Sequence, residues 1–234
     1  LCKERTATRI DSLGRDQRIM SSNVDFAVVP SDIEGIDRNH PCRSGAQVLD
    51  AENGLVARRR DKLAIVGYAT SSRDLAPFDD PEYEIVGLNQ LYRFIKRADF
   101  WCDIHCNWDS ENVEGTDHEG WLRECGLPVL LSTTKPTIPT SVRFPLERAI
   151  EVGMDYFTST ISYLIAWSIV QGYKEIGLYG IDLVVGTEYE AQKACAEFWL
   201  GVANGRGMTV RLPYETALLR HSYRYGYEKG PNVG

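Results

Sequence analysis

Short apolar runs alternate with helical stretches between residues 62 and 212 of this chain. The runs are nearly continuous in apolar residues, which is typical of buried strands in a parallel sheet. They lie at residues 63–67, 83–88, 99–105, 128–134, 176–179 and 208–212. The stretches between them predict helices at 91–97, 121–125, 145–150, 161–170 and 190–204. Strands that alternate with helices predict an α/β fold, a single Rossmann-like domain with a mostly parallel sheet flanked by helices.

The first quarter of the chain does not share this pattern. Arg, Asp, Ser and Gly dominate it, and only residues 26–29 resemble a strand. We therefore expect a poorly ordered N-terminal extension at 1–60, a nucleotide-binding domain at 61–228 and a tail at 229–234. The basic run Arg58-Arg59-Arg60 precedes the first convincing strand. It could bind phosphate, but we favour the solvated end of a linker.

Composition narrows the class of protein. The 234 residues are 43% hydrophobic and 25% charged, as in ordinary globular proteins. No apolar run reaches the roughly 18 residues of a membrane span, and no N-terminal stretch resembles a signal peptide. A formal charge of −7 does not indicate nucleic-acid binding, although a nucleic acid stays possible as an acceptor. The 6 cysteines are then expected to be reduced thiols in a cytoplasmic protein.

The stretch from residue 158 to residue 182 carries the strongest signal. Its hydroxyl residues Thr158, Ser159 and Thr160 can cap the apolar helix that follows. A short apolar run then ends in Gly180-Ile181-Asp182, which places a carboxylate at the carboxyl end of a strand. Ligand groups of α/β sheets gather at that edge, so this stretch predicts half of a nucleotide site.

The loop after the first strand is the natural partner of that stretch. It reads Gly67-Tyr68-Ala69-Thr70-Ser71, and small or hydroxyl residues there permit a tight turn close to phosphate. It is not a Gly-x-Gly-x-x-Gly motif and lacks the lysine of a P-loop, which disfavours NAD-type and Walker-type sites. A plain strand-to-helix turn remains the alternative.

Two further strand ends carry polar groups. Asn89 follows the second strand, where its amide can contact a base or ribose, or can cap the next helix. Cys102, His105 and Cys106 lie at the end of the third strand, which suggests a metal site. Zinc spacing is lacking, and alternation puts His105 on the opposite face from both cysteines. We favour a strand end with core thiols and expect no metal.

Together these motifs resemble the bacterial sialyltransferases that act on lipooligosaccharide. They are also similar to the wider set related to the archaeal 6-hydroxymethylpterin diphosphokinases. The resemblance covers residues 62–212 and rests most on the stretch from Thr158 to Asp182. It implies a Rossmann-like fold that binds a cytidine monophosphate sugar, with no cofactor and no metal required. The nucleotide contacts it implies are Gly67, Ser71, Asn89, Thr158, Ser159 and Asp182.

The same resemblance suggests catalytic residues. Tyrosines beyond the Gly-Ile-Asp strand assist the phosphate leaving group in that family, and Tyr189 could stand there. The family's histidine base lies downstream in a His-Ser context, which here is matched by His221-Ser222 beyond the last strand. The family's loop reads Gly-Asn-Gly-Pro-Ser, so the loop at 67–71 lacks the second glycine and the proline.

Three functions follow from these residues. The first is transfer of a sugar from a nucleotide-activated donor to a hydroxyl acceptor, whose identity is open. The second is diphosphate or phosphoryl transfer from ATP with magnesium, held by Asp182 with Asp103 or Asp109. The third is a nucleotide-binding module without catalysis.

Overall fold

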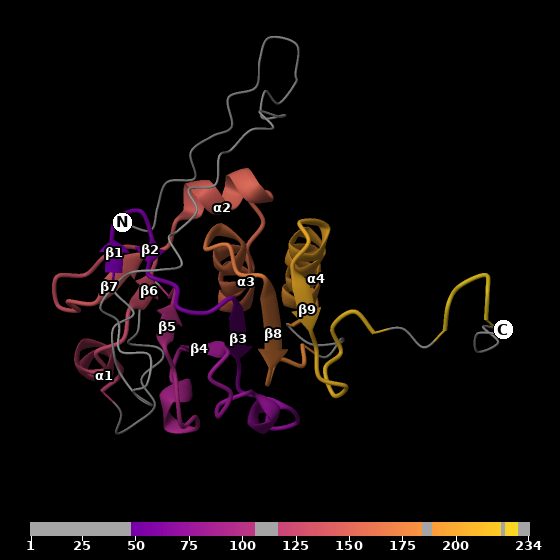
Figure 1. Cartoon of the computed structure of the whole chain (residues 1–234), viewed down its shortest axis with the longest axis horizontal. Coiled ribbons are helices and arrows are strands. Elements are labelled where there is room, and N and C mark those ends of the chain that lie inside the picture. Colours follow the sequence, from indigo (N-terminus) through magenta and orange to yellow (C-terminus); the bar gives the residue numbers. More distant parts are fainter. Residues whose placement is uncertain (1–47, 106–116, 184–188, 221–222, 229–234) are drawn as a thin grey trace, which may run out of the picture.

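The computed structural model describes residues 48–105, 117–183, 189–220 and 223–228 (Figure 1). Its strands are β1 (Val48–Asp50), β2 (Leu55–Val56), β3 (Lys62–Val66), β4 (Tyr83–Leu88), β5 (Phe100–Asp103), β6 (Val129–Leu131), β7 (Ser141–Arg143), β8 (Glu175–Tyr179) and β9 (Thr209–Arg211). Its helices are α1 (His118–Glu124), α2 (Leu146–Val152), α3 (Thr160–Val170) and α4 (Tyr189–Gly205), with the single 3₁₀ turns η1 (Arg73–Leu75) and η2 (Leu91–Arg93).

Seven strands form one parallel sheet in the order β7-β6-β5-β4-β3-β8-β9. This confirms the predicted α/β class with its mostly parallel sheet. The chain runs from β3 outward to β7 on one side and then returns to place β8 and β9 on the other side. The order therefore reverses between β3 and β8, and a doubly wound sheet binds its ligands beside such a switch point.

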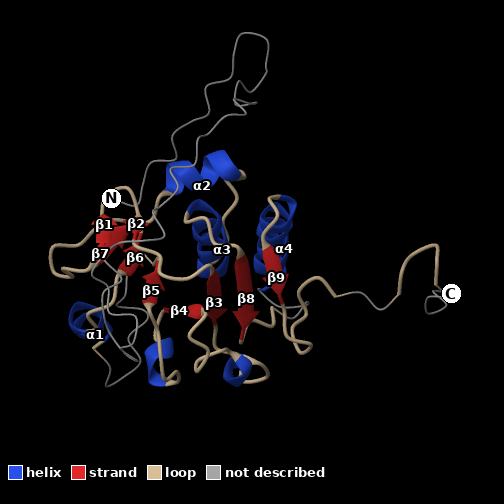
Figure 2. Cartoon of the chain, in the orientation of Figure 1, coloured by secondary structure: helices blue, strands red, loops and turns tan. Residues whose placement is uncertain are grey.

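Alternating side chains of the central strands face two apolar cores. Leu63 and Ile65 face the larger core, which α2, α3 and α4 complete, while Ala64 and Val66 face a smaller core completed by Leu122 of α1. Figure 2 shows α3 and α4 beside β3, β8 and β9. Almost every residue of α3 is buried, which explains why its sequence is apolar on all sides. No helix in the described ranges is both long and apolar enough to span a membrane.

Two element predictions differ from the structure. The helix expected at 91–97 is only the turn η2. The Arg97 guanidinium instead binds the Tyr83 carbonyl at 2.7 Å and the Asp99 carboxylate at 3.1 Å, just before β5. Strand β7 was not predicted, because Pro136 and Pro139 suggested a break in the chain there. Its position at the edge of the sheet allows a short strand directly after these prolines.

Residues 48–60 are part of the packed body, which corrects the expectation of loose packing up to residue 60. Strands β1 and β2 pair antiparallel, and Val56 and Ala57 are fully buried. The Gln171 side chain at the end of α3 donates to the Gly54 carbonyl at 2.8 Å. Residues 1–47, including the strand expected at 26–29, lie outside the described residues.

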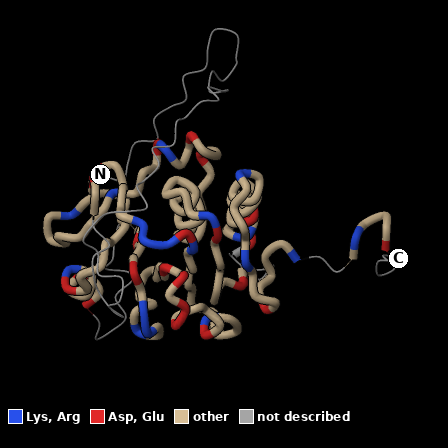
Figure 3. Tube along the Cα trace, in the orientation of Figure 1, with Lys and Arg blue, Asp and Glu red and all other residues tan. Residues whose placement is uncertain are grey.

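The basic run at residues 58–60 (the blue stretch leading into β3 in Figure 3) contributes Arg59 to a largely buried ion-pair network. The Arg59 side chain lies 2.8 Å from Asp99, and its backbone N–H donates to Glu84 at 3.0 Å. Tyr173 also donates to Glu84, at 2.8 Å. Burial raises the pKa of Glu84, and the hydrogen bonds from Arg59 and Tyr173 partly offset this. Arg59 is therefore not the solvated end of a linker, since it joins the chain before β3 to the amino ends of β4 and β5. Phosphate binding by the run stays a prediction.

Candidate functional site

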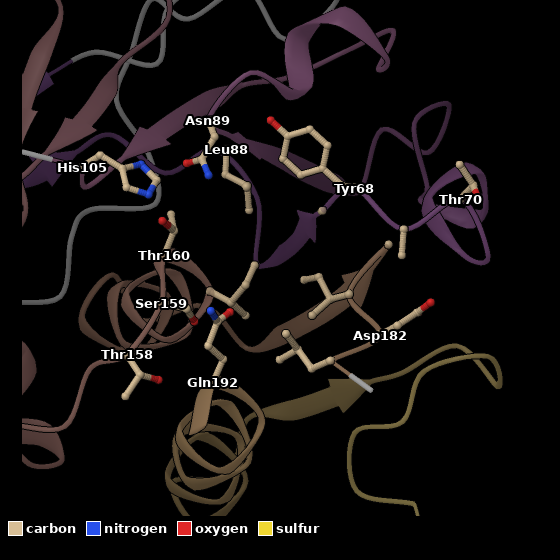
Figure 4. A pocket seen from close by; sticks show the side chains of 16 residues that line it. Tyr68, Thr70, Leu88, Asn89, His105, Thr158, Ser159, Thr160, Asp182 and Gln192 are labelled. Atoms are coloured by element: carbon tan, nitrogen blue, oxygen red, sulfur yellow. The ribbon is translucent and has the colours of Figure 1, made fainter. Parts of the chain in front are cut away.

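A pocket of about 890 Å³ opens at the carboxyl ends of the central strands. Its lining comes from the ends of β3, β4, β5 and β8 and from the starts of α3 and α4 (Figure 4). It therefore lies at the switch point of the sheet. Of the six residues predicted to contact a nucleotide, five line it: Gly67, Asn89, Thr158, Ser159 and Asp182.

Gly67 and Gly180 bring the ends of β3 and β8 together. A Cβ on Gly67 would lie 2.5 Å from the Gly180 carbonyl oxygen, and a Cβ on Gly180 would lie 2.5 Å from the Gly67 oxygen. Gly180 also has a φ of +66°, a conformation that side chains rarely adopt. The Ala69 N–H then donates to the Gly180 carbonyl at 2.9 Å. Gly67 lines the pocket as predicted, but its missing side chain serves the approach of two strands.

Ser71 holds Asp182 in place. Its hydroxyl donates to the Asp182 carboxylate, with the two oxygens at 2.9 and 2.8 Å. Ser71 itself does not line the pocket, but it contacts Asp182, which does. Its contact with a nucleotide stays a prediction. The neighbouring Ser72 accepts from the Gly180 N–H at 2.9 Å, which joins the same loop to the end of β8.

Asn89 is held by its backbone and presents its amide to the pocket. Its φ is 50°, a left-handed conformation that asparagine tolerates better than most residues. Its N–H donates to the Cys102 carbonyl at 3.0 Å, and the Trp101 indole donates to its carbonyl at 2.9 Å. The Asn89 Oδ1 is buried without a protein partner among the described residues. The expected helix-capping role is not seen, because Gln90 precedes η2 and makes no side-chain cap.

The start of α3 faces the pocket. Ser159 precedes the helix in an extended conformation and forms a capping-box arrangement with Ser162, in which the Ser159 Oγ faces the Ser162 N–H. That approach does not make a side-chain hydrogen bond, so the Ser159 Oγ is buried without a hydrogen-bond partner in the described part of the chain. The Ser162 hydroxyl meanwhile donates to the Ser159 carbonyl at 2.6 Å and fixes this turn. Thr158 donates to the Ala191 carbonyl of α4 at 3.3 Å. The free N–H groups of a helix start carry a partial positive charge, which suits a phosphate.

A histidine–aspartate–histidine group at the end of β5 was not predicted. Asp103 is fully buried and lies 2.8 Å from His105 Nδ1 and 2.6 Å from His118 Nε2. Burial raises the pKa of Asp103, but the hydrogen bonds from both histidines outweigh it and lower this pKa to about 2. The signal in the sequence was an Asp-x-His at a strand end, while the contribution of His118 depends on where α1 packs.

The residues considered as metal ligands have different surroundings in the structure. Cys102 is buried in the larger core, where burial raises its thiol pKa well above the usual value, while His105 lines the pocket. In the described ranges no three His, Cys, Asp or Glu side chains gather as a metal site. For magnesium, both Asp103 oxygens are engaged by histidines, and Asp109 lies outside the described residues.

The two predicted catalytic residues are not placed by the structure. His221 lies outside the described residues, and Tyr189 begins α4 but its side chain also lies outside them. Both roles stay predictions. Two polar lining residues were not predicted as ligand contacts: Gln192 from the first turn of α4, and His105, which was considered only as a metal ligand.

Comparison with known proteins gives similar structures but no family. No protein-family model and no curated protein matches the chain. Three similar solved structures are sialyltransferases, and two of them are from Campylobacter jejuni. An apo α-2,3-sialyltransferase is 16% identical with a TM-score of 0.47, covering 72% of this chain and 84% of that one. CstII with CMP-3FNeuAc is 15% identical with a TM-score of 0.44, covering 64% and 79%.

The third structure is CST-II in complex with a trisaccharide acceptor and CMP. It is 14% identical with a TM-score of 0.43, and the match covers 67% of this chain and 85% of that one. These scores describe a distant likeness, so what the pocket does has to be argued from its own residues.

Proposed function

We propose that this chain transfers a sugar from a nucleotide-activated donor, of the cytidine monophosphate–sugar kind, to a hydroxyl acceptor. The observation that carries the proposal is the set of unpartnered polar atoms in a pocket at the switch point. Among the described residues, Ser159 Oγ and Asn89 Oδ1 are buried there without a hydrogen-bond partner, beside the start of a buried helix. Buried polar atoms normally have a partner, so a polar ligand that supplies one accounts for both.

The charge of the lining favours a donor with one phosphate. None of the described lining residues is Lys or Arg, and the only carboxylate among them is Asp182. A nucleoside triphosphate would need cations, whereas a single phosphodiester suits a helix start with its hydroxyls. Asp182 can accept from ribose hydroxyls or a base amine. The pocket therefore fits a nucleoside monophosphate sugar better than ATP with magnesium.

The sequence resemblance to sialyltransferases leads us to choose cytidine monophosphate as the test ligand. Its most specific residues, the hydroxyls at 158–159 and Asp182, meet in this pocket. Cytidine monophosphate (CMP) in EDTA should raise the melting temperature. A ligand at 100 times its Kd adds about 2.7 kcal/mol to the free energy of unfolding.

Substitutions in the pocket locate the binding. Ser159→Ala should weaken CMP binding by roughly 10-fold, since it removes one hydrogen bond to a charged group. Asp182→Asn should weaken it by a similar factor. Ser132→Ala is the matched control, because Ser132 is an exposed hydroxyl after β6 and outside the lining.

Each outcome separates the candidate functions. A response to ATP that requires magnesium, with none to CMP, would favour phosphoryl transfer instead. CMP binding without any turnover of a CMP-sugar would favour a nucleotide-binding module without catalysis. Unchanged CMP affinity in both Ser159→Ala and Asp182→Asn would show that the nucleotide binds elsewhere.

A further inference from the structure

A buried carboxylate holds a pocket-lining imidazole at the end of β5. Asp103 is fully buried, and its Oδ1 receives both the backbone N–H of His105 at 3.1 Å and the His105 ring Nδ1 at 2.8 Å. Its Oδ2 lies 2.6 Å from Nε2 of His118, which is also fully buried. The His105 side chain is 40% exposed and lines the pocket. One imidazole is therefore inside the protein and the other reaches the ligand space.

The carboxylate decides which ring nitrogens carry hydrogen. The hydrogen bonds of both histidines, which overcome the effect of burial, keep the pKa of Asp103 at about 2, so it is ionised at neutral pH. An ionised carboxylate only accepts hydrogen bonds, and each ring nitrogen that faces it must therefore donate. In neutral His105 the hydrogen is then on Nδ1, which leaves Nε2 as the nitrogen that takes up a proton.

The packing around His118 holds the Asp103 carboxylate, which in turn directs the His105 imidazole. The His118 ring stacks on Tyr92, with centroids 5.7 Å apart and planes at 8°, and Tyr92 stacks on Trp121 at 4.0 Å and 10°. Asp103 is held in the sheet by pairing with Leu131 of β6. The carboxylate is therefore held between the sheet and the packed His118 ring. A rigid support of this kind suits an imidazole that has to meet a reacting group at a set position.

His105 and Asp182 lie at opposite ends of the pocket. Figure 4 shows His105 next to Asn89 and Thr160, with Asp182 on the far side and Ser159 between the two ends. A nucleoside anchored at Asp182, with its phosphate at the start of α3, would therefore direct its sugar toward His105. His105 and the phosphate-binding groups would then lie on either side of the bond between the sugar and the phosphate.

We propose that His105 is the general base of the sugar transfer, with Asp103 and His118 as its positioning residues, an inference that rests on the proposed function. His105 Nε2 takes the proton of the acceptor hydroxyl, and the acceptor oxygen forms its bond to the anomeric carbon. The bond from that carbon to the phosphate oxygen breaks, and its electron pair leaves with the nucleoside monophosphate. The helix start at Ser159 stabilises the charge that develops there.

Hydrolysis of CMP–sialic acid, with water as the acceptor, tests this assignment. His105→Asn should lower kcat by roughly 10²–10⁴-fold, the usual contribution of a general base. Its KM and the Kd for CMP should stay within about threefold of the wild type. In His105→Gly, added imidazole should restore part of kcat, which a purely structural role of His105 would not allow.

Substitutions of two carboxylates near the ends of β5, Asp103 and Asp99, form a matched pair that tests the positioning role of Asp103. Asp103→Asn should lower kcat on the order of 100-fold, because the imidazole loses its orientation. Asp99→Asn changes a carboxylate that pairs with Arg59 just before β5 and should leave kcat unchanged. In ¹⁵N spectra of the histidine rings, wild-type His105 should show hydrogen on Nδ1, and Asp103→Asn should alter this pattern.

The outcomes distinguish the inference from the proposed function. A wild type that neither binds CMP nor hydrolyses the donor would overturn both. Wild-type hydrolysis that persists in His105→Asn would overturn the inference alone. Hydrolysis that is abolished in His221→Asn but persists in His105→Asn would also overturn the inference alone, since the general base would then be the histidine predicted from the sequence.

Discussion

The approach of β3 to β8 at the pocket floor can be tested with four glycine substitutions that separate steric contact from backbone strain. Gly201 in α4 has neither a positive φ nor any atom within 4 Å of an added Cβ. Gly172 has a φ of +76° and open space around it. Gly67 lacks a positive φ but meets the Gly180 carbonyl, and Gly180 combines a positive φ with contact to the Gly67 carbonyl.

The expected changes in the free energy of unfolding follow from these two features. Gly201→Ala should stabilise by roughly 0.5–1 kcal/mol, because alanine loses less entropy in a helix. Gly172→Ala should destabilise by about 1–2 kcal/mol through its left-handed backbone. Gly67→Ala should cost about 1–3 kcal/mol by overpacking against backbone that cannot yield. Gly180→Ala combines both effects and should cost roughly 2–5 kcal/mol.

Urea unfolding followed by tryptophan fluorescence measures these differences by linear extrapolation. Trp101, Trp167 and Trp199 are all buried, so unfolding changes their surroundings. A Gly180→Ala variant no less stable than Gly172→Ala would refute the tight contact between β3 and β8. CMP titration adds a second readout, because only the substitutions at Gly67 and Gly180 should also weaken binding at the pocket.

Two further substitutions test the buried charges. Arg59→Met should destabilise by roughly 3–5 kcal/mol, because it leaves the buried Glu84 without its cation and leaves Asp99 with Arg97 alone. Urea unfolding measures this, and a loss under 1 kcal/mol would contradict the network. The pKa of Asp103 is about 2 in the folded chain against an ordinary 3.8, so its contribution is present above about pH 4 and is lost as the pH falls toward 2. The stability difference between wild type and Asp103→Asn should therefore shrink by roughly 2 kcal/mol between pH 5 and pH 2, and a constant difference would argue against this linkage.

Much of the fold follows from local pattern. The apolar runs of β3, β4 and β8 and the all-round apolar helix α3 are visible in the sequence because burial on both faces demands such residues. Short strands such as β7 and β1 carry too few residues for a pattern, and pairing with neighbours rather than their own composition makes them strands.

Part of the candidate site was also readable. Polar residues directly after parallel strands share one edge of the sheet, and for this reason Asn89 and Asp182 line the same pocket. What Ser71 does was not readable, since its partner Asp182 is 111 residues away and their contact depends on how the loop after β3 meets the end of β8.

The sequence by itself therefore determined the class of fold and the edge of the sheet where a ligand would bind. Both depend on periodicity and on residues next to one another in the chain. Only the tertiary structure decided the partners of buried charges. Arg59 meets a carboxylate 40 residues away, and Asp103 joins His105 to His118 across the packing of α1 on β5. Such pairs are chosen by the register of strands and the docking of helices, which no local pattern encodes.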